Sequence, residues 1–189
     1  MGTLLPDIRY LEVCLRENTH YEQMTLNEAV EDKSPFTAGV KFHSWVDLER
    51  EAFAEKAKIY DVIAEYKIDH PDAFLKFLED EILFPEVVSY SIPSPQPEEL
   101  QFGICKKDVF AWHLTLSLFL SFKPSTVLWG LEMGGVGFGN IQPEVIKQWN
   151  KVFKEAVADE RVVAYVELLK NHFSLKLQEV SVQIPWSSP

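Results

Sequence analysis

An alternating pattern between Trp112 and Phe122 constrains the fold more than any other feature of the chain. Every even position in this run is apolar, whereas most odd positions are small or polar. A period of two is typical of a β-strand that buries one face. A second alternating run follows over 127–133, and Pro124 favours a tight turn between the two runs. The sequence therefore predicts a β-hairpin over 111–133.

The rest of the chain shows both strand-like and helix-like spacing. Shorter alternating runs predict further strands over 11–15, 36–42, 88–92, 100–104 and 180–184. Apolar residues at helical spacing predict helices over 44–66 and 71–82, and others that begin at Pro143 and Asp159. We expect an α+β domain, with a mainly antiparallel sheet and helical hairpins packed on one face.

The length of 189 residues is that of a single domain, so we expect one α+β domain over 1–189. Three prolines over 93–98 indicate a surface linker between the halves 1–93 and 99–189. Both halves show the element order ββααβ, which is a weak sign of internal duplication.

The chain is acidic, with a formal net charge of −11, and the acidity is confined to its first half. Residues 1–100 have a net charge of −12, whereas residues 101–189 have a net charge of +1. Binding to phosphates requires Lys and Arg, so the balance argues against nucleic acid and anionic membranes as partners. It is compatible with a protein partner that has a basic surface, although an ordinary solubilising surface is the more common explanation of such a charge.

The two cysteines, Cys14 and Cys105, lie in no metal-ligand pattern, and we expect reduced thiols. The first residues lack the basic and apolar regions of a signal peptide. The longest apolar stretch, 114–122, is too short to span a bilayer. These observations predict a cytoplasmic protein.

The polar face of the predicted hairpin is one candidate site. His113, Ser117 and Glu132 would share this face, and Gly135 and Gly137 would form its rim. A catalytic triad is excluded, because four residues of strand separate His113 from Ser117 by about 13 Å. The glycines match neither a P-loop nor a dinucleotide fingerprint, and a close backbone approach explains them equally well. We therefore interpret these residues as candidates for a ligand pocket.

A second set of candidates could contact a partner protein. Glu79, Asp80 and Glu81 form an acidic run on a predicted helix, although such a run is more often a solvated face. Trp186 follows Pro185 near the C-terminus, where an exposed indole would serve as an anchor.

The sequence contains no motif that identifies a reaction. The five histidines form no HxH, HExxH or Cys–His pattern, so we expect neither a metal nor another cofactor. The leading hypothesis is a non-catalytic factor that binds another protein, such as an inhibitor, an immunity-type protein or an assembly factor. The alternative is a small enzyme or ligand-binding protein that uses the hairpin pocket. The oligomeric state is left open.

Overall fold

The computed structural model describes residues 3–87, 92, 94–100 and 103–183, and within this part of the chain the fold is helical. An isolated bridge between Phe138 and Ile141 is the one β-type pairing there, so the expected α+β architecture with an antiparallel sheet is wrong. The elements, in chain order, are η1 (Pro6–Leu11), η2 (Arg16–Asn18), α1 (Leu26–Val30), α2 (Pro35–Ala57), α3 (Ile59–Ala64), α4 (Pro71–Val87), η3 (Pro97–Leu100), α5 (Lys106–Ser121), α6 (Pro124–Gly134), α7 (Pro143–Ala158) and α8 (Glu160–Gln183).

The predicted hairpin is two helices, α5 and α6. The run is apolar at so many positions that alternation does not distinguish a strand from a helix, and its length and leucine content favour a helix. The buried residues of α5 follow helical spacing, since Val109, Trp112 and His113 face inward. Pro124 occupies the first turn of α6, where its missing N–H costs nothing, and forms no hairpin turn.

The other predicted strands fail for related reasons. Residues 36–42 belong to α2, which continues without a break to Ala57. The Ser34 hydroxyl caps the start of this helix by accepting a hydrogen bond from the Thr37 N–H. The run over 11–15 covers the end of η1 and irregular chain. Residues 180–183 continue α8, and much of 88–92 and part of 100–104 lie outside the described residues. Without these strands, the two ββααβ halves do not exist.

The helix starts at Pro71 and Pro143 were predicted correctly, whereas α2 and α6 begin at Pro35 and Pro124, where the sequence predicted the start of a strand and a hairpin turn. Helix α4 begins at Pro71 and buries Phe74, Phe77 and Leu78, as its spacing indicates. Helix α7 begins at Pro143 and buries Trp149 and other residues of its predicted apolar stripe. Amphipathic spacing over a whole helix is therefore informative in this chain, whereas short alternating runs are not.

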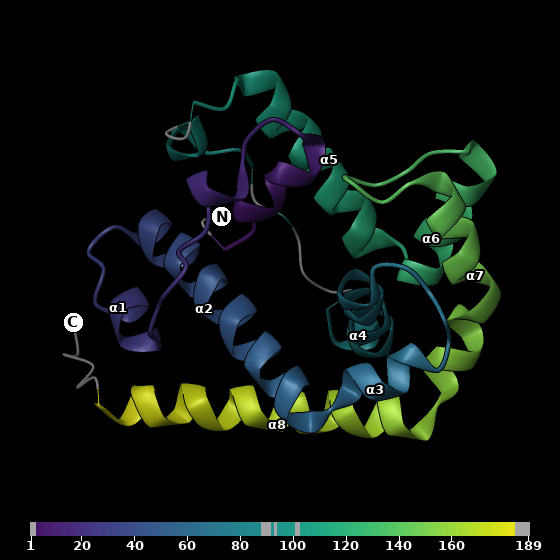
Figure 1. The fold of residues 1–189 in the computed structure, drawn as a ribbon. Coiled ribbons are helices and arrows are strands. Elements are labelled where there is room, and N and C mark those ends of the chain that lie inside the picture. Colours follow the sequence, from purple (N-terminus) through teal and green to yellow (C-terminus); the bar gives the residue numbers. More distant parts are fainter. Residues whose placement is uncertain (1–2, 88–91, 93, 101–102, 184–189) are drawn as a thin grey trace.

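Two hydrophobic clusters organise the molecule. The larger one surrounds α4 and α7, with contributions from α3, α6 and α8. The smaller one joins the N-terminal segment to α2 and α5 around Leu5, Ile8 and Trp112. Figure 1 shows α8 along one side of the molecule, with α2 running diagonally from the N-terminal segment toward α3. No helix in the described part is long and apolar enough to cross a membrane.

Candidate functional site: a polar cavity

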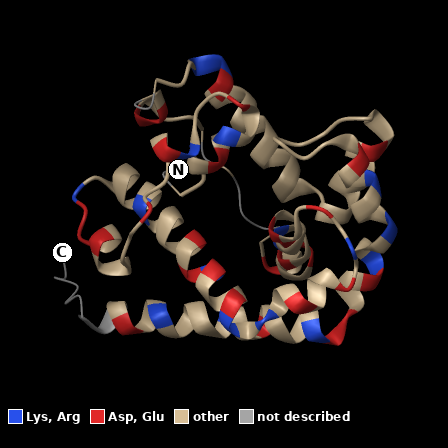
Figure 2. Ribbon diagram, in the orientation of Figure 1, with Lys and Arg blue, Asp and Glu red and all other residues tan. Residues whose placement is uncertain are grey.

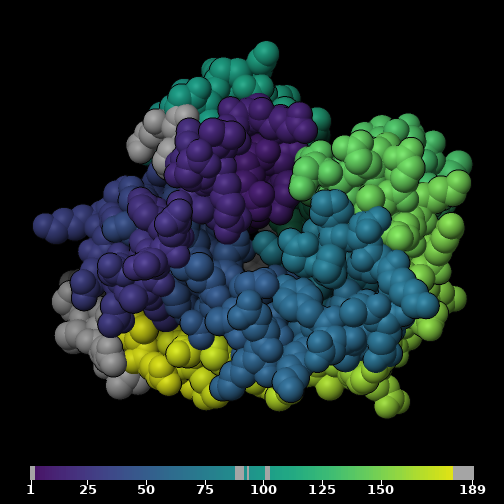
Figure 3. All heavy atoms as spheres, viewed as in Figure 1, coloured from purple at the N-terminus to yellow at the C-terminus, as the bar shows by residue number. Residues whose placement is uncertain are grey.

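A cavity of about 660 Å³ lies where the two clusters meet, and it is a candidate site. This volume is within the range of small-molecule pockets. Its walls come from the N-terminal segment, α2, α4, α5 and the loop before α7. In the space-filling view, this face is hollowed near its centre, between the purple N-terminal segment, the blue helices and the green loop (Figure 3).

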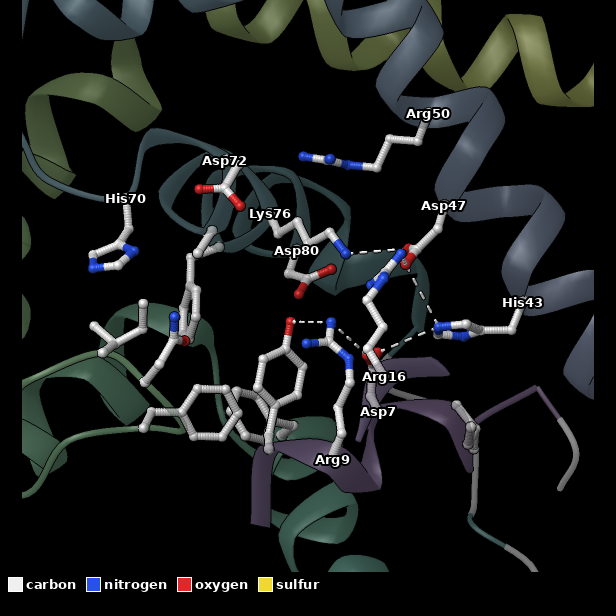
Figure 4. Close-up of a pocket in the computed structure, with 18 of the residues that line it drawn as sticks. Asp7, Arg9, Arg16, His43, Asp47, Arg50, His70, Asp72, Lys76 and Asp80 are labelled. Atoms are coloured by element: carbon white, nitrogen blue, oxygen red, sulfur yellow. Dashed lines mark hydrogen bonds and ion pairs between the residues drawn. The ribbon is translucent and has the colours of Figure 1, made fainter. Parts of the chain in front are cut away.

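Helical spacing places the charged residues of α2 and α4 on the cavity wall. His43 and Asp47 are four residues apart on α2, and Arg50 follows one turn later. Because residues at i and i+4 share a helix face, all three side chains reach the same side. The same rule brings Asp72, Lys76 and Asp80 of α4 to the opposite wall (Figure 4). The 3₁₀-helix η1 adds further polar residues, Asp7, Arg9 and Tyr10.

Aromatic rings form an apolar side of the cavity. The rings of Tyr10 and Phe138 stack with their centroids 5.0 Å apart, and Phe119 lies 5.5 Å from Phe138. Gly139 adopts a φ of +55° and passes close to the Tyr10 ring, so a side chain there would be strained and crowded. The cavity therefore has one apolar, aromatic side and one charged side.

Ion pairs neutralise part of the charged side. Lys76 Nζ lies 3.1 Å from Asp47 Oδ1, and Arg16 lies 3.4 Å from Asp47 Oδ2. Burial alone would raise the pKa of Asp47, but Lys76 and the neighbouring cations hold that pKa below its usual value. Asp47 is therefore a carboxylate at neutral pH. Arg9 lies 3.5 Å from Asp7 Oδ1.

Other polar groups in the cavity wall lack partners among the described residues. The Nε of Arg9 and the Nη2 of Arg50 are buried and form no hydrogen bond. Asp80 has no ion pair or hydrogen bond with any residue of the described part. Its accessible surface opens onto the cavity, and burial, with Glu79 beside it, raises the pKa of Asp80 to about 7. Arg9 Nε and Arg50 Nη2 have almost no accessible surface, so of these groups it is Asp80 that borders the open space of the cavity.

A histidine–aspartate cluster lies at the edge of the cavity. His20 Nε2 is 3.6 Å from Asp47 Oδ2, and His43 Nε2 is 3.7 Å from Asp7 Oδ2 and 3.8 Å from Asp47 Oδ2. The two imidazole rings meet edge to face, with centroids 5.1 Å apart. Burial and the nearby Arg16 lower the pKa of His20 to about 3, so this ring is neutral at physiological pH.

The predicted pocket residues of the 111–133 segment are not brought together. His113 Nε2 lies 2.7 Å from Glu99 Oε2, in a buried contact between α5 and η3. Ser117 donates to the His113 carbonyl oxygen within α5, and Glu132 accepts a hydrogen bond from Asn150 of α7. Each of the three side chains contacts a neighbouring helix or the backbone of its own helix, and none of the three lines the cavity.

The glycines of the predicted rim have structural roles. Gly135 ends α6 in the left-handed conformation, with a φ of +62°, and its N–H bonds to the carbonyl of Glu132. A Cβ at Gly137 would collide with the carbonyl oxygen of Ile141. The close backbone approach that the sequence offered as an alternative is therefore the observed reason for Gly137.

The predicted partner contacts point in different directions. Glu79 is buried, and it accepts hydrogen bonds from Arg50 Nε at 2.6 Å and from Tyr165. Glu81 accepts hydrogen bonds from the backbone N–H and the hydroxyl of Ser125. Asp80, the third residue of the run, faces the cavity. Trp186 lies outside the described residues.

The cavity and the histidine–aspartate cluster were not predicted from the sequence. The spacing of His43 and Asp47, four residues apart, could have indicated a shared helix face, but 36–42 was assigned to a strand. His20 and Asp7 lie in irregular or 3₁₀ segments, where no periodicity shows that they approach α2. Comparison of the chain with protein-family models, with curated proteins and with solved structures gave no significant match.

Proposed function

We propose that the protein binds a small molecule in the central cavity. The observation that carries the proposal is a space of about 660 Å³ bordered both by Asp80, which has no ion pair or hydrogen bond within the described part of the chain, and by an aromatic wall. Arg16 and Asn140 line the cavity and can donate hydrogen bonds to a ligand, and Asp80 offers a partner for a donor. The stacked rings of Tyr10 and Phe138 offer an apolar surface.

These groups define the chemistry of the ligand. We infer a small molecule with an apolar, ring-sized body and a polar end that both accepts and donates hydrogen bonds. A simple anion fits less well, because Asp72 and Asp80 also line the wall. Such a combination of apolar walls and a few converging polar groups is typical of ligand sites. The cytoplasmic location expected from the sequence stays a proposal, supported by the two free cysteines.

A thermal-shift screen of small polar-apolar metabolites tests this function. A ligand that binds only the folded state raises the unfolding temperature. The matched variant is Ala73→Trp, since Ala73 lines the cavity and a larger side chain there would fill it. We expect hits with the wild type that disappear in Ala73→Trp. Hits that persist unchanged in a correctly folded Ala73→Trp, or the absence of hits in a broad screen, would contradict the proposal.

A second candidate function, the binding of another protein, is favoured by a separate observation. Phe110, Leu114 and Leu118 recur every fourth residue on α5 and are 66%, 58% and 49% exposed. Trp129 and Met133 on α6 are 61% and 69% exposed. We call these five residues the α5–α6 apolar face. Exposed apolar side chains at this density are typical of interaction surfaces.

The chemistry of this face indicates an apolar partner surface. Residues 109–122 contain no charged side chain, and Glu132 is the one charged residue within α6. Figure 2 accordingly shows long tan stretches, without Lys, Arg, Asp or Glu, along α5 and α6. A basic partner, which the acidity of the first half suggested, would find no complementary charge here. We therefore propose that the α5–α6 apolar face binds an uncharged, apolar surface of a different protein.

Site-specific photocrosslinking tests this second candidate. A crosslinking amino acid at position 114 should give one identified adduct, and the same probe at the exposed Glu167 of α8 should not. Equal adducts at both positions, or a crosslink between two copies of the chain, would contradict it.

A further inference from the structure

We propose that Asp7, His20 and His43 form a binding site for a divalent transition-metal ion, with Asp47 as a fourth, facing carboxylate. One ligand atom from each of the first three residues lies within 4.8 Å of the others. Two imidazoles with a carboxylate are a common ligand set for such ions. This inference does not rest on the proposed small-molecule function.

Hydrogen bonds fix which nitrogen of each imidazole is free. His43 Nδ1 lies 2.9 Å from the carbonyl oxygen of Thr3, which can only accept, so this nitrogen carries the proton. His20 Nδ1 lies 3.0 Å from the Thr19 hydroxyl. That hydroxyl donates to the carbonyl oxygen of Pro6, so it accepts from His20. In the neutral form of each ring, the unprotonated nitrogen is therefore Nε2.

Both free nitrogens face carboxylates across distances that are too long for hydrogen bonds. The separations of 3.6 to 3.8 Å exceed the usual range, and neither Nε2 has a hydrogen-bond partner. The His20 side chain is only 3% exposed, so water does not easily replace that partner. A lone pair directed at an anion is unfavourable, and a cation between them removes the conflict.

The distances and the outer contacts suit a metal ion. Zinc–nitrogen bonds place neighbouring ligand atoms of a tetrahedral site about 3.3–3.4 Å apart. His43 Nε2 and Asp7 Oδ2 are 3.7 Å apart, and all three ligand atoms lie within 4.8 Å of one another, so the side chains would move closer together around the ion. The Nδ1 contacts of His20 and His43 are those that orient metal-binding imidazoles in proteins. Arg9 contacts Oδ1 of Asp7, which leaves Oδ2 directed toward His43.

Neighbouring cations set the strength of the site. Arg16 and Lys76 both pair with Asp47 and would compete with a metal for this carboxylate. For this reason we place Asp7 among the primary ligands and Asp47 as the facing group. Asp7, His43 and Asp47 also line the cavity, so an open coordination position could face a molecule bound there (Figure 4). The nitrogen ligands favour a transition metal over Mg²⁺ or Ca²⁺.

Calorimetric titration of untagged, chelator-treated protein with Zn²⁺ tests the site. We expect one ion per chain, with affinity reduced at least tenfold in each of the variants His20→Gln and His43→Gln. The matched control is His172→Gln, because His172 pairs with Glu49 elsewhere in the fold and should bind zinc as the wild type does. Ala73→Trp should also retain zinc, which separates this outcome from a failure of the small-molecule proposal.

Two results would overturn the proposal: no saturable zinc binding by the wild type, or wild-type affinity in both His20→Gln and His43→Gln. If circular dichroism shows that His20→Gln does not fold, Asp7→Asn is used in its place. That substitution removes the charge of the carboxylate ligand and preserves the size of the side chain. Co²⁺ provides a second readout, since coordination by imidazole nitrogen changes its visible absorption spectrum. A Co²⁺ spectrum that is identical in the wild type and in His43→Gln would likewise contradict the site.

Discussion

The Nε of Arg50 donates a hydrogen bond of 2.6 Å to Oε2 of Glu79, and both side chains are buried. Tyr165 donates to the other oxygen of Glu79, so this contact joins α2, α4 and α8. Burial opposes the charge of Arg50, but Glu79 beside it raises the pKa of the guanidinium above its usual value. The pair holds Arg50 at the cavity wall.

Removal of Glu79 should therefore destabilise the fold strongly. Glu79→Ala leaves a buried guanidinium without its counter-charge, which typically costs about 3–5 kcal/mol. The matched control, Glu86→Ala on the same helix, breaks an exposed pair with Lys170 and should cost at most about 1 kcal/mol. Urea unfolding of both variants measures the difference. Similar losses would contradict the buried network.

Asp80 should make stability depend on pH. Folding raises the pKa of Asp80 from about 4 in the unfolded chain to about 7. The ionised carboxylate therefore destabilises the folded state more and more as the pH rises from about 4 to about 7. Asp80→Asn removes the effect, and each kcal/mol gained should raise the unfolding temperature by about 2–4 °C. We expect Asp80→Asn to match the wild type near pH 4 and to exceed its unfolding temperature at pH 8.

The surface substitution Asp61→Asn serves as the control for this profile, because Asp61 is exposed on α3. A difference between Asp80→Asn and the wild type that stays constant from pH 4 to pH 8 would contradict a raised pKa for Asp80.

Adjacent residues on α6 distinguish the observed helix from the predicted strand. Leu128 is completely buried, whereas Trp129 is mostly exposed. Leu128→Ala should therefore cost about 2–5 kcal/mol, and Trp129→Ala should change stability by about 0.5 kcal/mol or less. The predicted hairpin requires the opposite order, since it places Trp129 in the core. Denaturant unfolding of the two variants decides between them.

Two glycines should respond to alanine with opposite signs. Gly137→Ala should destabilise the protein by about 1–3 kcal/mol, because its Cβ meets the Ile141 backbone. Gly130 lies within α6 with open space around its Cα, so Gly130→Ala should stabilise the helix by about 0.5–1 kcal/mol. Thermal unfolding provides the measurement, and equal effects at the two positions would refute the close approach.

Sequence patterns predicted individual helices better than the architecture. Full-length apolar stripes identified α4 and α7, and prolines marked where they begin. The hairpin was wrong because apolar residues at every second position also recur at every fourth position, so the run satisfies both a period of two and helical spacing. The face of α5 that carries Leu114 and Leu118 is exposed, so apolar character alone did not locate the core.

The candidate site was beyond what the sequence pattern could indicate. Its residues come from η1, the loop at His20, α2 and α4, and only tertiary packing brings them together. Asp80 was singled out as part of an acidic run, yet the structure shows it at the cavity wall, separated in role from Glu79 and Glu81. Charge runs in a sequence do not specify which side chains share an environment.

The most direct test of the central cavity is a fluorescence titration with N-phenyl-1-naphthylamine, an uncharged probe with an aromatic body and an N–H donor. The double variant Phe110→Ser/Trp129→Ser removes competing binding at the α5–α6 apolar face and serves as the reference protein. We expect saturable binding of one probe per chain to this reference, and loss of that binding when Ala73→Trp is added. Unchanged binding after addition of Ala73→Trp would contradict a ligand site in the cavity.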